Sequence, residues 1–402
     1  MNVNDLLDDA ELDSAVQFPH PLTSHWQQPR AVFLTGSTGF LGVYLLAALL
    51  RQTAATVHCL VRAEDATAGM VRIQQQMQFY QLWQEAFAPR IVPVIGDLAL
   101  PRFGLDEVNF SELAASIDVI YHNGALVNAM YPYARLRASN VGGTVEVLKL
   151  AGMHHTKPVN FVSTLAVFFS DVYIDQIVLE SDYATVDAGL QGGYKQSKWV
   201  AEALIREARA RGLPAIIHRP GRILGDSHSG IINRLSDLLG NLLQGCLQLE
   251  QFPLVDSLIN FAPVDYVSEA IVHLGQQASS LNRNFHVCNP HSISWNDLWA
   301  VIASLGYKVD GVDFQQWAEV ISQRAKSKQD KELYLILRHL LRSPIYLFSP
   351  KPSFATYQTE FEMARIARSC PAIDKPLLTT YLRYFEEHDC IPRTAFRNDT
   401  AA

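Results

Sequence analysis

The feature that most constrains the fold is a glycine-rich turn between an apolar run and a long apolar helix pattern. The run AVFLTG (31–36) predicts a buried strand, and FLGVYLLAALLRQ (40–52) predicts the helix after it. Between them, Gly36, Gly39 and Gly42 form a G-x-x-G-x-x-G pattern. Glycines are needed where a turn is tight and where backbone approaches a pyrophosphate, and a helix N-terminus offers N–H groups to phosphates. This turn therefore predicts a dinucleotide site.

Further apolar runs alternate with amphipathic helix patterns as far as residue 225. The predicted strands are 31–36, 56–63, 90–97, 117–125, 158–168 and 214–223, and the predicted helices are 40–52, 71–87, 140–153 and 195–212. Continuous apolar strands between helices indicate a parallel sheet that is covered on both faces. The predicted fold class is therefore α/β, a doubly wound parallel Rossmann-type sheet. Asn140, at the start of its helix, is expected to be an N-terminal cap.

The regular pattern weakens after residue 225 and returns as a helix at 261–275 and a strand at 285–290. The chain is therefore predicted to have a Rossmann domain and a smaller, split, mainly helical C-terminal substrate domain, preceded by an acidic linker. The predicted boundaries are 1–28 for the linker, 29–225 plus 259–290 for the Rossmann domain, and 226–258 plus 291–402 for the substrate domain.

Composition excludes several classes of protein. The chain of 402 residues is 49% hydrophobic, too apolar for a disordered protein, and its net charge of −7 argues against nucleic-acid binding. The five cysteines are widely spaced without a Cys-x-x-Cys pair, so we expect no metal site and buried thiols in a reducing cytoplasm. No secretory signal is expected, and the uncharged stretch 31–50 is too rich in glycine and hydroxyl residues for a membrane span.

The end of the second strand indicates which dinucleotide binds. An NAD site usually has an Asp or Glu there to hold the ribose 2′-hydroxyl. Here the strand ends at Arg62, and Arg72 lies at the start of the next helix. A guanidinium pairs with a 2′-phosphate, so NADPH is favoured. Glu64 and Asp65 lie nearby, and a solvated helix position is the alternative for Arg72.

The ends of the third and fourth strands complete the expected cofactor site. Asp97 and Leu98 follow the third strand, where they are expected to meet the adenine. Asn123, Gly124 and Ala125 follow the fourth strand, where small residues let backbone lie under the cofactor.

A second group of residues predicts catalysis. Tyr194 and Lys198 are four residues apart, on one face of a helix, and Thr164 ends the preceding strand. A nearby cation stabilises a phenolate, so we expect the pKa of Tyr194 to lie below its usual value of about 10. Such a phenol can exchange a proton with a carbonyl oxygen, and Thr164 can fix the position of that carbonyl.

With these motifs the chain resembles the extended short-chain dehydrogenases/reductases, and more narrowly the thioester reductase (R) domains that terminate non-ribosomal peptide synthetases and occur in carboxylic acid reductases. The similarity covers residues from about 31 to 290. It is carried by TGSTGFLG (35–42), CLVRA (59–63), GD (96–97), NGALVN (123–128), STLAV (163–167), YKQSK (194–198), HRPGRILGDS (218–227) and FAPVDYV (261–267).

The resemblance implies roles for particular residues. Thr164, Tyr194 and Lys198 would form the catalytic triad. The residues implied to hold NADPH are Thr35, Gly36, Thr38, Gly39, Phe40, Leu41, Gly42, Arg62, Arg72, Asp97, Leu98, Asn123, Gly124, Ala125, Tyr194, Lys198, Pro220, Gly221 and Ile223.

The resemblance also implies a substrate and a partner. The substrate would be an acyl or peptidyl thioester on the phosphopantetheine arm of a carrier protein, reduced directly by hydride to an aldehyde or further to a primary alcohol. Residues 324–342 carry six basic and two acidic side chains, a candidate docking face for an acidic carrier, with a solvated amphipathic helix as the alternative.

Three other functions stay open. A sugar-nucleotide epimerase or dehydratase has the same fold and triad but usually prefers NAD, which Arg62 disfavours. A fatty acyl-CoA reductase would act on small thioesters. A non-catalytic NADP-sensing protein would often lack the Tyr194 and Lys198 pair.

Overall fold

The computed structural model describes residues 3–128, 130–186, 189–233, 238–324 and 352–392. The chain divides into two compact units, each built from separated segments. Unit 1 is Met1–Gly221, Val267–Val287 and Pro352–Ser369, and unit 2 is Arg222–Tyr266, Cys288–Lys351 and Cys370–Ala402. The predicted boundaries differ from this division chiefly in two places, since residues 3–28 and 352–369 belong to unit 1.

Unit 1 is built on a seven-stranded sheet in the order β12-β7-β5-β4-β1-β2-β3 with every neighbouring pair parallel. The order reverses between β1 and β4, and ligands of such sheets bind at the carboxyl ends of the strands beside this switch point. The strands are β1 (Ala31–Thr35), β2 (Thr56–Val61), β3 (Ile91–Ile95), β4 (Val119–His122), β5 (Val159–Val162), β7 (Ala215–Pro220) and β12 (Asn284–Val287).

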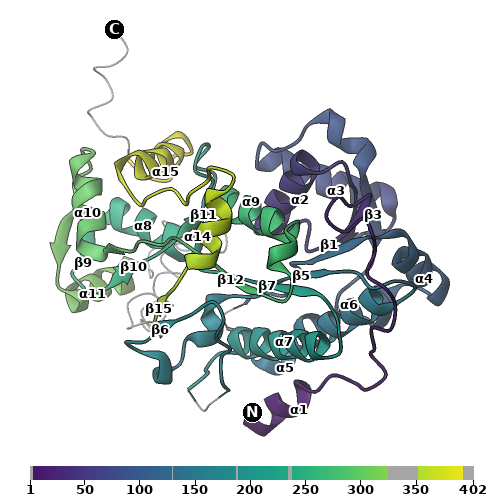
Figure 1. The fold of residues 1–402 in the computed structure, drawn as a ribbon. Coiled ribbons are helices and arrows are strands. Elements are labelled where there is room, and N and C mark those ends of the chain that lie inside the picture. Colours follow the sequence, from purple (N-terminus) through teal and green to yellow (C-terminus); the bar gives the residue numbers. More distant parts are fainter. Residues whose placement is uncertain (1–2, 129, 187–188, 234–237, 325–351, 393–402) are drawn as a thin grey trace. The chain divides into compact units, whose positions relative to one another are not determined.

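Helices cover both faces of this sheet (Figure 1). One face carries α2 (Phe40–Gln52), α3 (Ala66–Phe79) and α9 (Val264–Gly275), and the other carries α4 (Glu107–Ser116), α6 (Gly143–Gly152) and α7 (Gly193–Ala210). Most of the strands are buried and apolar because both faces are covered, whereas the edge strand β3 is only partly buried. The predicted fold class is confirmed, and each predicted strand overlaps an observed one, but the run 158–168 is a strand only as far as Val162 and forms a 3-10 helix at Leu165–Phe168. The second helix lies earlier than predicted, because Asp65 caps it by accepting from the Ala68 N–H.

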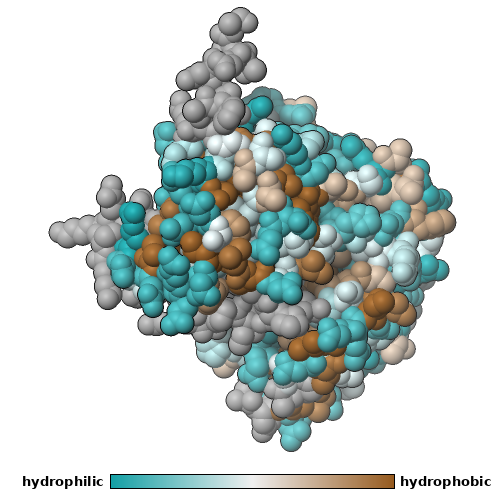
Figure 2. Space-filling model, turned by 90° about the vertical axis from the view of Figure 1, so that its left-hand side faces the viewer, coloured by the Kyte–Doolittle hydropathy of each residue, from teal (hydrophilic) through white to brown (hydrophobic). Residues whose placement is uncertain are grey.

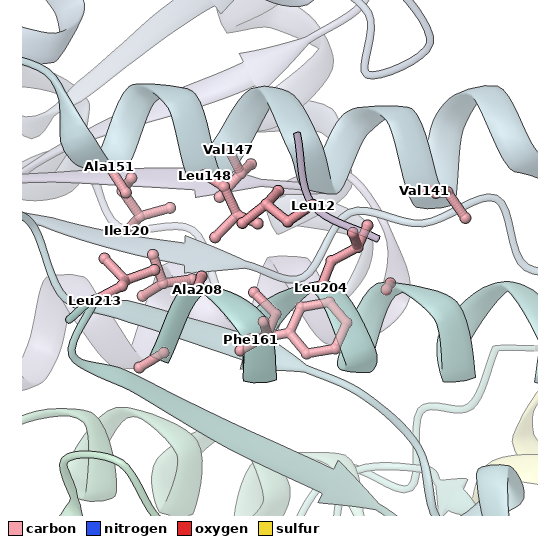
Figure 3. Packing of buried hydrophobic residues seen from close by; sticks show 14 of the residues in the cluster. Leu12, Ile120, Val141, Val147, Leu148, Ala151, Phe161, Leu204, Ala208 and Leu213 are labelled. Atoms are coloured by element: carbon pink, nitrogen blue, oxygen red, sulfur yellow. The ribbon is translucent and has the colours of Figure 1, made fainter. Parts of the chain in front are cut away.

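The core between the sheet and the second layer is formed by aliphatic side chains of α6 and α7. Figure 3 shows Leu148 and Ala151 of α6 and Leu204 and Ala208 of α7 in one cluster with Ile120 and Phe161 of the sheet. Leu12, from the N-terminal segment, lies within the same cluster. This packing fixes α7 on the sheet, and α7 carries two of the predicted catalytic residues.

The acidic N-terminal segment is packed rather than separate. It contains α1 (Val3–Asp9) and buries Leu6, Leu12, Val16 and Phe18 in the unit 1 core. The carboxylate of Asp9 accepts from the Tyr133 hydroxyl at 2.7 Å and pairs with Arg137 at 2.5 Å. Arg211, directly after α7, donates to the carbonyls of Leu12, Asp13 and Val16. The segment therefore belongs physically to unit 1.

The segment 352–369 returns to unit 1, where strand pairing and the carboxylate of Glu180 hold it. β15 (Ser353–Phe354) pairs with β6 (Ile177–Val178), and α14 (Tyr357–Ala364) follows. The buried carboxylate of Glu180 accepts from the backbone N–H groups of Gln358 and Thr359, and from the Thr359 hydroxyl at 2.6 Å. Glu180 therefore satisfies N–H groups at the N-terminus of α14.

Unit 2 is mainly helical, as predicted. Its helices are α8 (Leu238–Leu249), α10 (Trp295–Ser304), α11 (Phe314–Arg324) and α15 (Lys375–Glu387). Short two-stranded sheets connect them: β8 (Ile223–Leu224) with β11 (Ala262–Pro263), β9 (Gln251–Pro253) with β14 (Asp310–Val312), and β10 (Leu258–Ile259) with β13 (Ile293–Ser294). Of the basic stretch 324–342, Arg324 is the last residue of α11, and the remainder lies outside the described residues.

The uncharged stretch 31–50 folds, as expected, into a strand, a turn and most of a helix. In the described part of the chain, no helix is both long and apolar enough to cross a bilayer. Figure 2 shows a face on which hydrophobic residues form separate patches between hydrophilic ones.

Candidate active site

The glycine-rich turn lies between β1 and α2, at the switch point of the sheet. Gly36 has a φ of +72°, and a Cβ there would lie 2.7 Å from the Gly124 Cα. A Cβ on Gly42 would lie 1.8 Å from the Gly36 carbonyl oxygen. A Cβ on Gly39, in contrast, would meet nothing closer than 3.4 Å. The chain itself therefore requires Gly36 and Gly42, whereas Gly39 leaves open space at the start of α2, as a pyrophosphate needs.

Two other residues of this turn, which the sequence predicts to bind the cofactor, make contacts within the protein itself. The Thr35 hydroxyl is fully buried and accepts from the Gly124 N–H at 2.8 Å. The Phe40 ring packs against Tyr44 and Tyr80, with centroid distances of 5.8 and 5.4 Å. Thr38 and Leu41 are half-buried at the start of α2.

The end of β2 presents two exposed cations. The Arg72 guanidinium donates to the Arg62 carbonyl at 2.7 Å, so the two arginines lie together beyond the strand. Asp65 is engaged as the cap of α3, where its carboxylate accepts from the Ala68 N–H. The Asp65 carboxylate is therefore occupied in capping α3, and the side chains of Arg62 and Arg72 remain exposed.

The residues that follow β3 and β4 lie next to the glycine turn. The Asp97 carboxylate accepts from the Ala99 N–H at 2.9 Å, which shapes the turn after β3. Asn123 donates to the Gly36 carbonyl at 3.4 Å. Leu98 packs so tightly on Gly124 that a Cβ there would lie 2.5 Å from the Leu98 side chain. These strand ends thus meet at the carboxyl edge of the sheet, and Ala125 continues the chain beside them.

The first two turns of α7 carry the phenol and the ammonium. Tyr194 is half-buried in the first turn, and Lys198 is 3% exposed one turn later. The Lys198 ammonium donates to the Val162 carbonyl at 2.5 Å and lies 4.2 Å from the centroid of the Phe161 ring. Val162 is the last residue of β5, so Lys198 is bound to the strand end that leads to Thr164.

Thr164 caps the short helix that follows β5. Its Oγ1 accepts from the Ala166 N–H at 3.2 Å, and the side chain is half-buried. Because Val162 binds Lys198 and lies only two residues before Thr164, the structure brings the strand end and the helix of the predicted triad together.

The pKa values at this site follow from burial. Burial raises the pKa of Tyr194 to about 12. Burial also lowers the pKa of Lys198 to about 7, against the opposing effect of the Glu202 charge. The predicted lowering of the Tyr194 pKa is therefore wrong, because burial disfavours the charged phenolate. At neutral pH the phenol is protonated, which is the form that can donate a proton.

Asn140 is not the N-terminal cap that the sequence predicts. It lies inside a π-helical turn, Ala138–Gly142, that joins α5 (Tyr133–Arg137) to α6 without a break. Its side chain is buried, where the carbonyl accepts from the Leu126 N–H at 2.7 Å and the amide donates to the Ser197 hydroxyl at 2.9 Å. A continuous helix has no end to cap at this point, so the side chain is available to hold α7 and the loop after β4.

An ion pair that the sequence does not predict involves neighbours of the predicted triad residues. Glu202, one turn after Lys198, pairs with Arg219 at 2.5 Å and accepts from the Ser163 hydroxyl at 2.7 Å. Both charged side chains are almost completely buried. Ser163 precedes Thr164, and Arg219 precedes Pro220. The only signal in the sequence is the spacing of four residues between Lys198 and Glu202.

The predicted residues after β7 fall in different units. Pro220 ends β7, and the Gly221 N–H donates to the Val287 carbonyl at 3.2 Å, both in unit 1. Ile223 belongs to unit 2, where β8 pairs with β11. In the same unit the Ser227 hydroxyl donates to the Asp265 carboxylate at 2.6 Å, which joins the GDS and PVDYV motifs.

Comparisons with known proteins identify the class of this fold and site. Residues 34–271 match the NAD-binding family described as Male sterility protein. The chain belongs to this family, a group of extended short-chain dehydrogenase/reductase domains that bind NAD or NADP.

More specific similarities lie among peptide synthetase domains. The chain is 40% identical over 388 residues to a linear gramicidin synthase polypeptide of Brevibacillus parabrevis; the match covers 94% of this chain and only 8% of that much longer protein. The terminal R domain of the myxalamid PKS-NRPS pathway superposes with a TM-score of 0.90 at 38% identity, covering 97% and 98% of the two chains. The R domain of a Mycobacterium tuberculosis nonribosomal peptide synthetase gives a TM-score of 0.79 at 26% identity, covering 97% and 100%. The predicted resemblance to synthetase R domains is confirmed.

Proposed function

We propose that this chain releases an acyl or peptidyl thioester from a carrier protein by NADPH-dependent reduction. The product is an aldehyde, or the primary alcohol if the aldehyde is reduced again. The observation that supports this most directly is the bond from Lys198 to the Val162 carbonyl, because it joins the helix of Tyr194 to the strand end of Thr164.

The residues around the glycine turn fit NADPH. The open space at Gly39 suits the pyrophosphate at the start of α2, and Arg62 with Arg72 suits the 2′-phosphate. Asp97, Leu98 and the Asn123–Ala125 turn would lie along the adenosine and the pyrophosphate. When bound, NADPH supplies the hydride for the thioester carbonyl.

The predicted triad would supply a proton to the carbonyl oxygen of the substrate. Tyr194 is protonated at neutral pH, since burial holds its pKa near 12, and it would donate to the carbonyl oxygen of the substrate as negative charge develops there. Thr164, oriented by the Ala166 N–H, would donate to the same oxygen. Lys198 would hold the nicotinamide ribose and favour phenolate formation after proton transfer.

The proposed partner is a carrier protein with a phosphopantetheine-bound substrate. Its support is the similarity to R domains, which are parts of peptide synthetases. Residues 324–342 stay a candidate docking face from their charge alone, and beyond Arg324 they lie outside the described residues.

The test follows absorbance at 340 nm with NADPH or NADH against an acyl-pantetheine thioester, the matching aldehyde and a nucleotide sugar. Oxidation of NADPH by the thioester is expected, and oxidation by the aldehyde would add the second reduction. Tyr194→Phe should abolish turnover and leave NADPH binding nearly unchanged, since it removes a proton donor only. Conversion of the sugar without thioester reduction would replace the proposal by an epimerase, and full activity of Tyr194→Phe would refute the triad.

A further inference from the structure

A buried histidine lies between the cofactor turn and the catalytic helix. His122 is the last residue of β4 and is 1% exposed. Its Nδ1 lies 2.8 Å from the hydroxyl of Thr35, on β1, and its Nε2 lies 3.0 Å from the hydroxyl of Thr144, on α6. One imidazole ring therefore links the glycine turn to the helix layer.

The neighbouring bonds determine where the ring carries its proton. The Thr144 hydroxyl donates its single proton to the backbone carbonyl of Asn140 at 2.7 Å, so it can only accept from His122. Nε2 of His122 must therefore carry a proton. Burial, together with the charge of Lys198, lowers the pKa of His122 to about 3, so the ring is neutral. Nδ1 is then bare and accepts from the Thr35 hydroxyl.

The hydrogen bonds before Thr35 and after Asn140 run in the same donor-to-acceptor direction. The Thr35 hydroxyl accepts from the Gly124 N–H at 2.8 Å, at the turn proposed to lie under the cofactor. On the other side, the Asn140 amide donates to the Ser197 hydroxyl at 2.9 Å. Ser197 donates to the carbonyl of Tyr194, also at 2.9 Å. Hydrogen bonds thus lead from Gly124 to the backbone carbonyl of Asn140, and the side chain of the same residue continues them to the backbone of Tyr194, the proposed proton donor.

We infer that His122, as the neutral Nε2–H tautomer, is a positioning residue that sets the cofactor turn and the Tyr194 helix relative to each other. This inference rests on the proposed function, because it assigns NADPH to one end and proton donation to the other. The ring has one donor and one acceptor, and each is used once. A side chain with only the acceptor can bond to Thr35 alone, and one with only the donor can bond to Thr144 alone.

Two substitutions separate the ends. His122→Asn keeps an amide carbonyl near the Nδ1 position and can still accept from Thr35, but it does not reach Thr144. His122→Gln keeps an N–H donor near the Nε2 position for Thr144, but loses the acceptor for Thr35. A buried hydrogen-bonding group left without a partner changes an equilibrium or a rate by about 5- to 100-fold.

The expected results are therefore opposite for the two variants. His122→Asn should lower kcat by about 5- to 100-fold with the Kd for NADPH, measured by cofactor fluorescence, changed less than about threefold. His122→Gln should raise that Kd by about 5- to 100-fold with the smaller effect on kcat. Thr144→Val should reproduce the His122→Asn result, since it removes the acceptor at the same end.

The control is Tyr121→Phe. Tyr121 precedes His122 on β4, is buried, and has a hydroxyl 3.5 Å from the Val272 carbonyl, outside this set of bonds. Its Kd and kcat should match the wild type. If both His122 variants lose binding and turnover in equal proportion to their loss of thermal stability, the role of His122 is only structural and the inference is overturned.

A second readout does not depend on activity. A long-range ¹H–¹⁵N NMR spectrum should show a neutral Nε2–H histidine signal at neutral pH that is absent from His122→Gln. A proton on Nδ1, or on both nitrogens, would overturn the inference. If the wild type binds NADPH but reduces no thioester, the proposed function fails, and the tautomer and NADPH binding still confirm or refute the role of His122.

Discussion

The buried ion pair between Glu202 and Arg219 gives the sharpest prediction about stability. Both guanidinium contacts are direct, with Nη2 2.5 Å from Oε1 and Nε 3.3 Å from Oε2. The perturbation is Glu202→Gln, which keeps the size of the side chain and removes its charge. Arg219 would then keep a neutral amide oxygen as its acceptor in place of the carboxylate, besides its contacts of 3.4 Å to the Glu180 carbonyl and to His286 and its position over the Phe168 ring.

The magnitude follows from burial. The Arg219 side chain is 0% exposed and that of Glu202 is 5% exposed, so water cannot replace the lost carboxylate. Breaking one partner of such a pair costs about 3–5 kcal/mol, whereas replacing both partners by neutral groups is often nearly neutral. Glu202→Gln should therefore lower the free energy of unfolding of unit 1 by about 3–5 kcal/mol. The double variant Glu202→Gln/Arg219→Met should recover most of this loss.

The assay is urea unfolding followed by circular dichroism, with hydrogen exchange of peptides from α7 and β7 to assign the transition to unit 1. The control is Lys149→Met, which breaks the half-exposed pair with Glu146 and should cost about 1 kcal/mol or less. Although burial alone would raise the pKa of Glu202, Arg219 holds it below its usual 4.5, so the contribution of the pair should persist above that pH and disappear as the pH falls below it. A cost under about 1 kcal/mol for Glu202→Gln, or no recovery in the double variant, would refute the reasoning.

Four further predictions concern Lys198, the 2′-phosphate site and the glycine turn. As the pH rises through about 7, kcat/KM for the thioester should fall, because burial lowers the pKa of Lys198 and the ammonium is lost; Lys198→Arg, which stays charged, should show no such fall in a pH–rate profile. Arg62→Ala should weaken NADPH by about 10- to 100-fold in a titration and leave NADH almost unchanged, and equal losses would move the 2′-phosphate site elsewhere. Gly39→Ala should cost at most about 1 kcal/mol in stability yet weaken NADPH more than tenfold, since the chain leaves room for a Cβ there. Gly42→Ala should cost about 3 kcal/mol or more in thermal unfolding, because its Cβ would lie 1.8 Å from the Gly36 oxygen; a stable Gly42→Ala protein would contradict the role of that glycine.

The strands, the glycine turn and the helix of Tyr194 could be predicted from sequence because their signals are local. An apolar run, a glycine spacing and a four-residue helical spacing depend only on neighbouring residues. The outline of a Rossmann-type sheet follows from the same alternation of strands and helices.

The other features depend on contacts between residues far apart in the chain. The role of Asn140 depends on Ser197 and Leu126, and nothing local shows that the preceding helix continues through it. The pKa of Tyr194 depends on how deeply α7 is packed, so a rule based on the nearby lysine gave the wrong direction. The acidic N-terminal segment resembles a linker in composition, and only its contacts with Arg211 and the core show that it belongs to unit 1.

The division into two interleaved units has a consequence for protein engineering. The chain passes from one unit to the other at 221/222, 266/267, 287/288 and 369/370, and again at 351/352. Neither unit is encoded by a continuous stretch of gene, so a single crossover between two related genes cannot exchange one unit intact. A chimera that carries unit 2 of another relative needs three inserted segments with matched junctions. Recombination at random positions should therefore yield folded hybrids rarely.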